Sequence, residues 1–148
     1  LHTLPHTEKV LSFVFGSPSP ASSNSTQTYA DTGLSASITP SSSGSKVLSI
    51  ATLQALGFNE GAGACGVGTQ VLRASTVIGS GDTSIYISSG YFACPITYNI
   101  LDSPATTNAT VYKVQFKKAT ANGTAYAQDV FGESTGALSS IVLLEIAA

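Results

Sequence analysis

The sequence predicts an all-β protein, an antiparallel β-sandwich, from three observations. Around nine or ten short apolar stretches are separated by turns rich in Gly, Pro, Ser and Asn. Within several stretches, apolar and polar residues alternate with the two-residue period of an extended chain. Residues 96–118 combine both features, because two alternating runs flank a stop at Ser103-Pro104. We therefore expect strand, turn and strand there, with the rest of the chain pairing around them.

The remaining strands follow from β-branched, leucine or aromatic residues gathered between turn residues. The expected strands are 9–15, 27–30, 34–39, 46–53, 69–75 with 76–78, 84–88, 96–102, 110–118, 124–128 and 137–148. Turns are expected at 31–33, 40–45 and 79–83, and Asn122-Gly123 is a strong hairpin signal. Residues 54–68 carry dense glycines but no Lys-Ser/Thr pair of a phosphate loop, so we expect an irregular loop.

The closing strand is apolar on both faces. Val142, Leu144 and Ile146 point one way, and Ile141 and Leu143 point the other way. Such a strand must be covered on both sides, by the second sheet on one side and by another subunit on the other. We therefore expect a homotrimer in which Ile141 and Leu143 lie at the subunit interface, near the threefold axis.

Composition restricts the classes of partner. Only 9% of the 148 residues are charged, against an average near 25%, and the net charge is −2. No basic cluster beyond Lys117-Lys118 is present, which argues against a nucleic-acid partner. No apolar run approaches the ~20 residues of a membrane-spanning helix, so we expect no membrane insertion.

The domain organisation is simple. Residues 9–148 are expected to form a single domain, and residues 1–8 an extended N-terminal segment or the end of an upstream region. Because the sequence contains no methionine, either a leader was cleaved or these residues are the end of a longer polypeptide. The length and identity of any upstream region are open.

No catalytic constellation is visible. The only histidines, His2 and His6, flank the helix-breaking Pro5, so their four-residue spacing predicts no metal site. Aspartates are scattered at expected turns, where their side chains commonly bond the backbone. We expect no enzyme, no metal and no cofactor. A glycan-cleaving pair of carboxylates is a less favoured alternative, since the separation it needs is spatial.

Three N-glycosylation patterns begin at Asn24, Asn108 and Asn122. They support an alternative, a secreted eukaryotic lectin-like or adhesion domain. In a chain this rich in Ser, Thr and Asn, matches by chance are expected.

Three segments carry a resemblance to a known family. Residues 28–50 (TYADTGLSASITPSSSGSKVLSI), 100–118 (ILDSPATTNATVYKVQFKK) and 139–148 (SSIVLLEIAA) resemble the C-terminal domain of bacteriophage tail-fibre and related virion proteins, of the type found in phages of marine and cyanobacterial hosts. The resemblance implies a jelly-roll-like sandwich knob, trimeric, at a fibre tip or on the virion surface. It implies contact with other virion proteins and with the host surface, and it brings no catalytic residues. Capsid decoration with an architectural role is the alternative.

Two loops are expected to bind a host surface glycan or protein. They carry Phe58, Asn59 and Glu60 in 57–61, and Tyr91 and Phe92 in 88–94. The alternative is that the aromatic residues fill the ends of the core.

For Cys65 and Cys94 we expect two buried thiols and not a disulfide, since a phage protein assembles in a reducing cytoplasm.

Overall fold

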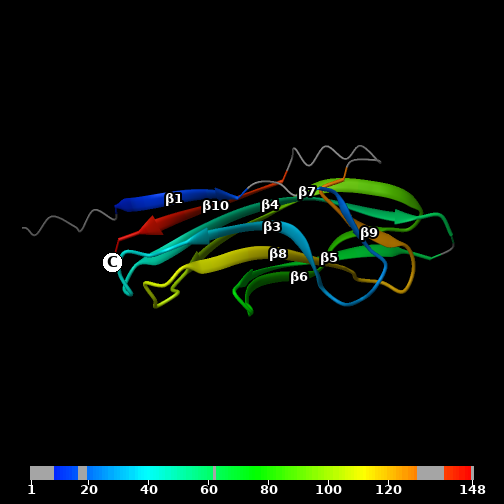
Figure 1. The fold of residues 1–148 in the computed structure, drawn as a ribbon. Helices are drawn as coiled ribbons and strands as arrows, with labels where there is room; N and C mark the ends of the chain where they lie inside the picture. Colours follow the sequence, from blue (N-terminus) through cyan, green and yellow to red (C-terminus); the bar gives the residue numbers. More distant parts are fainter. Residues whose placement is uncertain (1–8, 17–19, 62, 130–138, 148) are drawn as a thin grey trace, which may run out of the picture.

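A computed structural model describes residues 9–16, 20–61, 63–129 and 139–147. These residues form ten β-strands and no helix (Figure 1). The strands are β1 (Val10–Gly16), β2 (Ser22–Asn24), β3 (Ala30–Ile38), β4 (Lys46–Asn59), β5 (Cys65–Arg73), β6 (Thr76–Ile87), β7 (Gly90–Asp102), β8 (Thr110–Lys118), β9 (Thr124–Ala127) and β10 (Ser140–Ile146). Accordingly, no described helix is long and apolar enough to cross a membrane.

The strands form two sheets that pack face to face (Figure 1). One sheet has six strands, in the order β1-β10-β4-β9-β2, with β7 on the other side of β4. The second sheet has the order β3-β8-β5-β6, and every pairing in both sheets is antiparallel. Without the short β2 and β9, the four-strand orders β1-β10-β4-β7 and β3-β8-β5-β6 define a jelly roll. The predicted fold class is therefore confirmed.

Strand β4 is the longest strand and the centre of the larger sheet. It pairs with β10 over residues 46–52, with β9 over residues 55–58, and with β7 over residues 47–59. The second half of β4 lies in the region where an irregular loop was predicted. That prediction was wrong because it relied on local glycine content, whereas pairing on both sides holds this segment extended.

Two predicted hairpins are crossovers between the sheets. The strands of the 96–118 stretch are β7 and β8, which belong to different sheets. Likewise, β9 follows the Asn-Gly turn but pairs with β4 and β2, not with β8.

The turn predicted at 79–83 lies inside β6. Neither Gly79 nor Gly81 has the positive φ of a turn glycine, and a Cβ on Gly79 would lie 2.6 Å from Cδ1 of Ile100. The turn predicted at 31–33 is an irregularity inside β3, where Gly33 has a φ of 83°.

The core lies between the sheets. Its largest fully buried side chains include Leu34, Leu53, Val67, Tyr112 and Phe116. Ile141 and Leu143 also belong to it, each with none of its surface exposed. The placement of these two residues at a subunit interface was therefore wrong, because β10 turns this face toward the second sheet. Whether the chain is a trimer stays a prediction.

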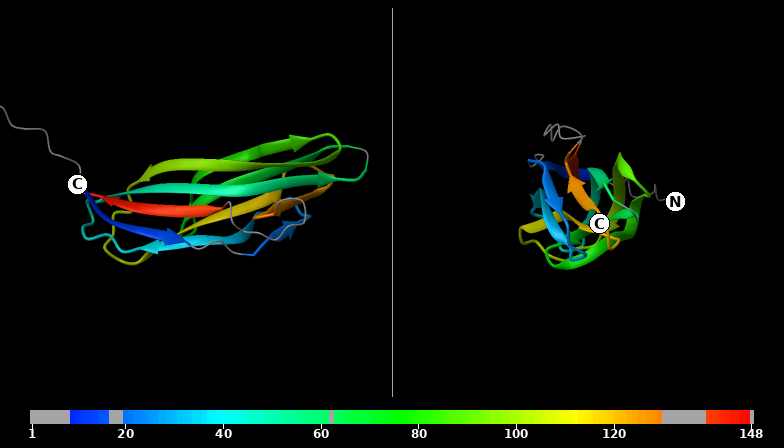
Figure 2. Two further views of the ribbon diagram at one scale, coloured as in Figure 1. Left: turned by 90° about the horizontal axis from the view of Figure 1, so that it is seen from above. Right: turned by 90° about the vertical axis from the view of Figure 1, so that its right-hand side faces the viewer.

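The two poles of the sandwich differ. At one pole Val10 pairs with Ile146, so both described ends of the chain lie there (Figure 2). At the opposite pole Asn59 pairs with Gly90, where β4 ends and β7 begins. The sequence-predicted binding residues are at this second pole.

Candidate functional site

An aromatic pole is formed by Phe58, Glu60, Tyr91 and Phe92. Phe58 and Tyr91 are direct partners on β4 and β7, with ring centroids 6.2 Å apart. Tyr91 and Phe92 are 58% and 51% exposed, Glu60 is exposed, and Phe58 is half-buried. The structure thus brings four of the five predicted residues together at the end of one sheet. The alternative that Tyr91 and Phe92 fill the core does not hold.

Asn59 is not part of the exposed surface. Only 5% of it is exposed, and its Nδ2 donates to the Gly63 carbonyl at 2.8 Å. Its Oδ1 accepts from the Gly61 N–H at 3.1 Å, as asparagine commonly does in a turn. The prediction of Asn59 as a ligand contact was therefore wrong, and the residue fixes the turn that carries Glu60.

One exposed aromatic residue at this pole was missed. Tyr86 on β6 is exposed and pairs with Gly66, one residue from the pairing of Ile87 with Cys65. The available signal was its alternation with the buried Ile85, which indicates that its side chain points outward.

A second surface, the apolar face, lies on the outside of the six-stranded sheet. It consists of Phe13, Phe15, Leu48, Ile50, Leu101, Val142 and Leu144, which point away from the core. Phe13, Phe15 and Leu101 are 63%, 67% and 57% exposed. The alternation along β10 was predicted correctly, but the face assigned to the subunit contact was the wrong one.

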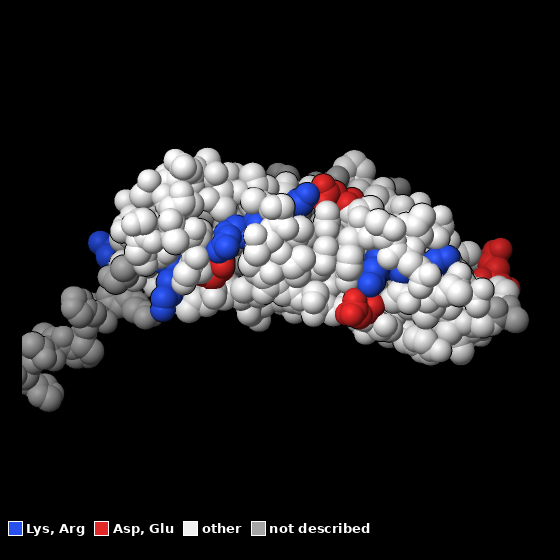
Figure 3. Space-filling view, turned by 90° about the horizontal axis from the view of Figure 1, so that it is seen from below, with Lys and Arg blue, Asp and Glu red and all other residues white. Residues whose placement is uncertain are grey.

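The outer face of the four-stranded sheet is polar. Lys113 pairs with Asp31 and Lys117 pairs with Asp82, each at 3.0 Å. Figure 3 shows Lys and Arg side chains next to acidic side chains on this face. The hydrogen bond from Lys117 lowers the pKa of the Asp82 carboxyl. Since these charges are paired and both acidic side chains are exposed, this face suits contact with water.

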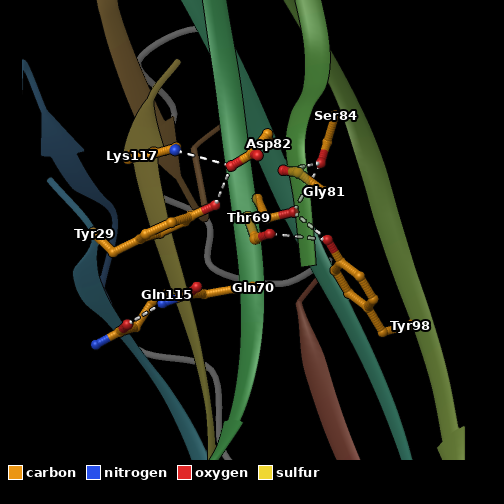
Figure 4. A network of polar contacts seen from close by, with 9 residues as sticks. All are labelled: Tyr29, Thr69, Gln70, Gly81, Asp82, Ser84, Tyr98, Gln115 and Lys117. Carbon is orange, nitrogen blue, oxygen red and sulfur yellow. Dashed lines mark hydrogen bonds and ion pairs between the residues drawn. The ribbon is translucent and has the colours of Figure 1, made fainter. Parts of the chain in front are cut away.

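Figure 4 shows a network of polar contacts, in which Tyr98 and Thr69 link the two sheets. The Tyr98 hydroxyl on β7 donates to the Thr69 carbonyl on β5 at 3.0 Å. The Thr69 hydroxyl lies 3.0 Å from the Ser84 hydroxyl on β6. Nearby, Gln70 Nε2 donates to Gln115 Oε1 at 2.7 Å, and Tyr29 contacts Asp82 and Lys117. Because these side chains contact one another, we assign them a structural role.

The two cysteines are free thiols in the structure, with Cys65 buried and Cys94 half-buried. Burial raises the pKa of both thiols. Among the described residues no group of three or more His, Cys, Asp or Glu could hold a metal ion. His2 and His6 lie outside the described residues, as does the predicted 1–8 segment.

The first glycosylation pattern is inaccessible. Asn24 is 7% exposed, and its amide donates to the carbonyls of Thr28 and Phe116. Asn108 and Asn122 are exposed.

No family model and no curated protein match this sequence. Solved structures with some likeness include the infectious bursal disease virus Gt strain, with a TM-score of 0.46 at 12% identity over 99% of this chain and 41% of that chain. Infectious bursal virus-derived T=1 particles give 0.44 at 12% identity, covering 99% and 39%. The infectious bursal disease virus VP2 subviral particle gives 0.41 at 12% identity, covering 99% and 40%.

This chain spans about two fifths of the length of those chains. At such identities and TM-scores the likeness carries no information on function.

Proposed function

We propose that this chain is a virion structural protein whose aromatic pole contacts the host cell surface. The observation that carries the proposal is the exposure of Tyr91, which lies beside Phe58, and of the neighbouring Phe92, at the pole opposite Val10 and Ile146. A segment joined at either described end would extend from the pole opposite these aromatic residues. The jelly roll is used by capsid and lectin domains, which supports the proposal by analogy only. The resemblance to phage tail-fibre domains supports it from the sequence.

The chemistry of the pole suits a neutral ligand. Aromatic rings offer large contact area at low entropic cost, and they stack on the apolar faces of sugars. Glu60 supplies a carboxylate that accepts hydrogen bonds from hydroxyl groups. The target class is therefore a surface glycan or a protein loop of the host, and no cofactor is required.

A purely architectural role, such as capsid decoration, is the second candidate. The apolar face favours it, because an exposed apolar patch commonly marks a contact with another protein. In either role we expect assembly with other virion proteins and no enzymatic activity. Tail fibre and capsid surface are both compatible with this fold.

Adsorption of the isolated chain to cells of candidate hosts tests the recognition role. The double variant Tyr91→Ala/Phe92→Ala is expected to lose adsorption with little change in melting temperature, because both side chains are largely exposed. Val77→Ala/Val111→Ala is the matched control, since it removes exposed apolar surface from the four-stranded sheet near the opposite pole. Adsorption that survives the first substitution would contradict the assignment.

A further inference from the structure

We infer that the apolar face is covered by a second copy of this chain. The inference rests on the proposed role as a virion subunit present in many copies. It names the partner of the apolar face, which the proposed contact with the host does not involve.

The register of the six-stranded sheet makes the apolar face continuous. One row runs straight across four strands, through Phe13, Leu144, Leu48 and Leu101. The next row on the same side runs through Phe15, Val142, Ile50 and Asn99. Directly opposed residues of antiparallel strands share a face, so seven apolar side chains form one patch. The Phe13 and Phe15 rings contact each other edge to face at 5.6 Å.

Polar residues border the patch on one side. Beyond the second row lie Ser140, Thr52 and Thr97, whose two threonine hydroxyls are 3.0 Å apart. On the other side the next row contains Val10, Ile146 and Lys46, so only Lys46 is polar there. An apolar centre with a polar rim is the usual anatomy of a protein–protein interface.

The charge pattern favours a copy of this chain over a charged partner. Neither row contains a charged residue, so two such faces can meet without opposing like charges. The outer face of the other sheet carries ion pairs, including Asp31 with Lys113 and Asp82 with Lys117. An ionic partner would have to leave its charges unpaired against the apolar face, which is costly.

The size of the face agrees with this assignment. Strands about 4.8 Å apart with a rise of about 3.4 Å per residue give roughly 450 Å² of sheet over the part of β4 that pairs with β10. Two copies that pack this face together would bury about 900 Å² in projection, which is the size of a weak or transient contact and lies below the roughly 1,200–2,000 Å² of stable interfaces. The face is therefore large enough for a weak contact between copies.

Light scattering of the purified full chain tests the inference. The wild-type protein is expected to have a mass of at least two copies of the 15.0 kDa chain, and a mass of three copies would match the predicted trimer. Phe13→Lys/Leu101→Lys places charge in the patch at two exposed positions, so it should reduce the mass to one copy. Val111→Lys, on the exposed outer side of β8, is the matched control and should keep the wild-type mass.

A monomeric wild-type protein would overturn the inference, as would a double variant that keeps its mass. Circular dichroism and the melting temperature of each variant show that a loss of mass is not a loss of fold. Because no host cell enters this experiment, its failure is separate from failure of the adsorption test. A monomer that still adsorbs would overturn only the copy–copy contact, and an oligomer that does not adsorb would contradict only the recognition role.

Discussion

Arg73 and Asp102 join the two sheets at the pole where the described chain ends meet. Arg73 Nη1 on β5 lies 2.8 Å from Asp102 Oδ1 on β7, and it also donates to the Ser103 carbonyl at 3.1 Å. The fully buried Tyr112 donates its hydroxyl to Asp102 Oδ2 at 2.7 Å. Burial, together with this hydrogen bond to Asp102, raises the pKa of Tyr112 far above its ordinary value. Asp102 therefore serves as the acceptor that connects three strands.

The first prediction concerns this connection. Asp102→Asn should lower the free energy of unfolding by about 1.5–3 kcal/mol, because it removes hydrogen bonds to a charged group that is mostly buried. Asp31→Asn is the control, since the Asp31–Lys113 pair is more exposed and should contribute only about 0–1 kcal/mol. Urea unfolding measures both values. Equal losses in the two variants would show that Asp102 has no special role.

The second prediction concerns Glu145, a buried carboxylate at the end of β10. Burial raises its pKa, but the hydrogen bonds from the Ser41 hydroxyl and N–H, each 2.7 Å, together with one from the Ser12 hydroxyl at 3.2 Å, outweigh burial and lower the pKa from its ordinary value of 4.5. The folded-state pKa is thus lower than the unfolded one. The stability from Glu145 is therefore present above pH 4.5 and is lost as the pH falls through the folded-state pKa.

Glu145→Gln should consequently be less stable than the wild type at neutral pH by about 1–3 kcal/mol. It should also lose less stability on acidification, because the titrating group is gone. Unfolding free energies in urea at neutral pH and at about pH 3 test this. If the variant loses as much stability on acidification as the wild type, the pH dependence of stability arises from groups other than Glu145.

The third prediction separates the structural residue of the aromatic pole from its exposed neighbour. Asn59→Ala removes both hydrogen bonds that hold the turn after β4, so it should cost about 1–3 kcal/mol of stability. Glu60→Gln changes only an exposed side chain and should stay within about 0.5 kcal/mol. Thermal or urea unfolding distinguishes them, and a neutral Asn59→Ala would show that the turn does not depend on this side chain.

The fourth prediction concerns the thiols. Alkylation followed by peptide mass spectrometry should find Cys65 and Cys94 unlinked, with Cys65 reacting more slowly because it is fully buried. Unfolding the protein should make the two rates similar. Quantitative crosslinking of the pair in purified particles would contradict the free-thiol state.

Alternation in the sequence predicted most strands, but not their partners. For Thr110–Lys118 it identified the buried set correctly, because one face is polar and the other is not. For Ser140–Ile146 both faces are apolar, so alternation alone did not tell the core face from the outer face. Ile141 and Leu143 were assigned outward for this reason.

The pairing of strands within the sheets was not predicted, for a related reason. The turn after Asp102 has the local residues of a hairpin, yet β7 and β8 join different sheets. Which sheet receives a strand depends on pairing with strands distant in the sequence, such as β4 with β7 and β5 with β8. The structural role of Asn59 was missed for the same reason. Its hydrogen-bond partner Gly63 follows a strand that was predicted to be part of a loop.

The most direct test of the virion role is the composition of purified virus particles from the source of this sequence. Mass spectrometry should detect this chain in the particles, and gold-labelled antibody should bind their surface, either on the tail or on the head. Labelling should be strongest with an antibody whose epitope includes Tyr91 and Phe92, because the aromatic pole points outward in this arrangement. Particles that lack the chain would contradict the proposed function.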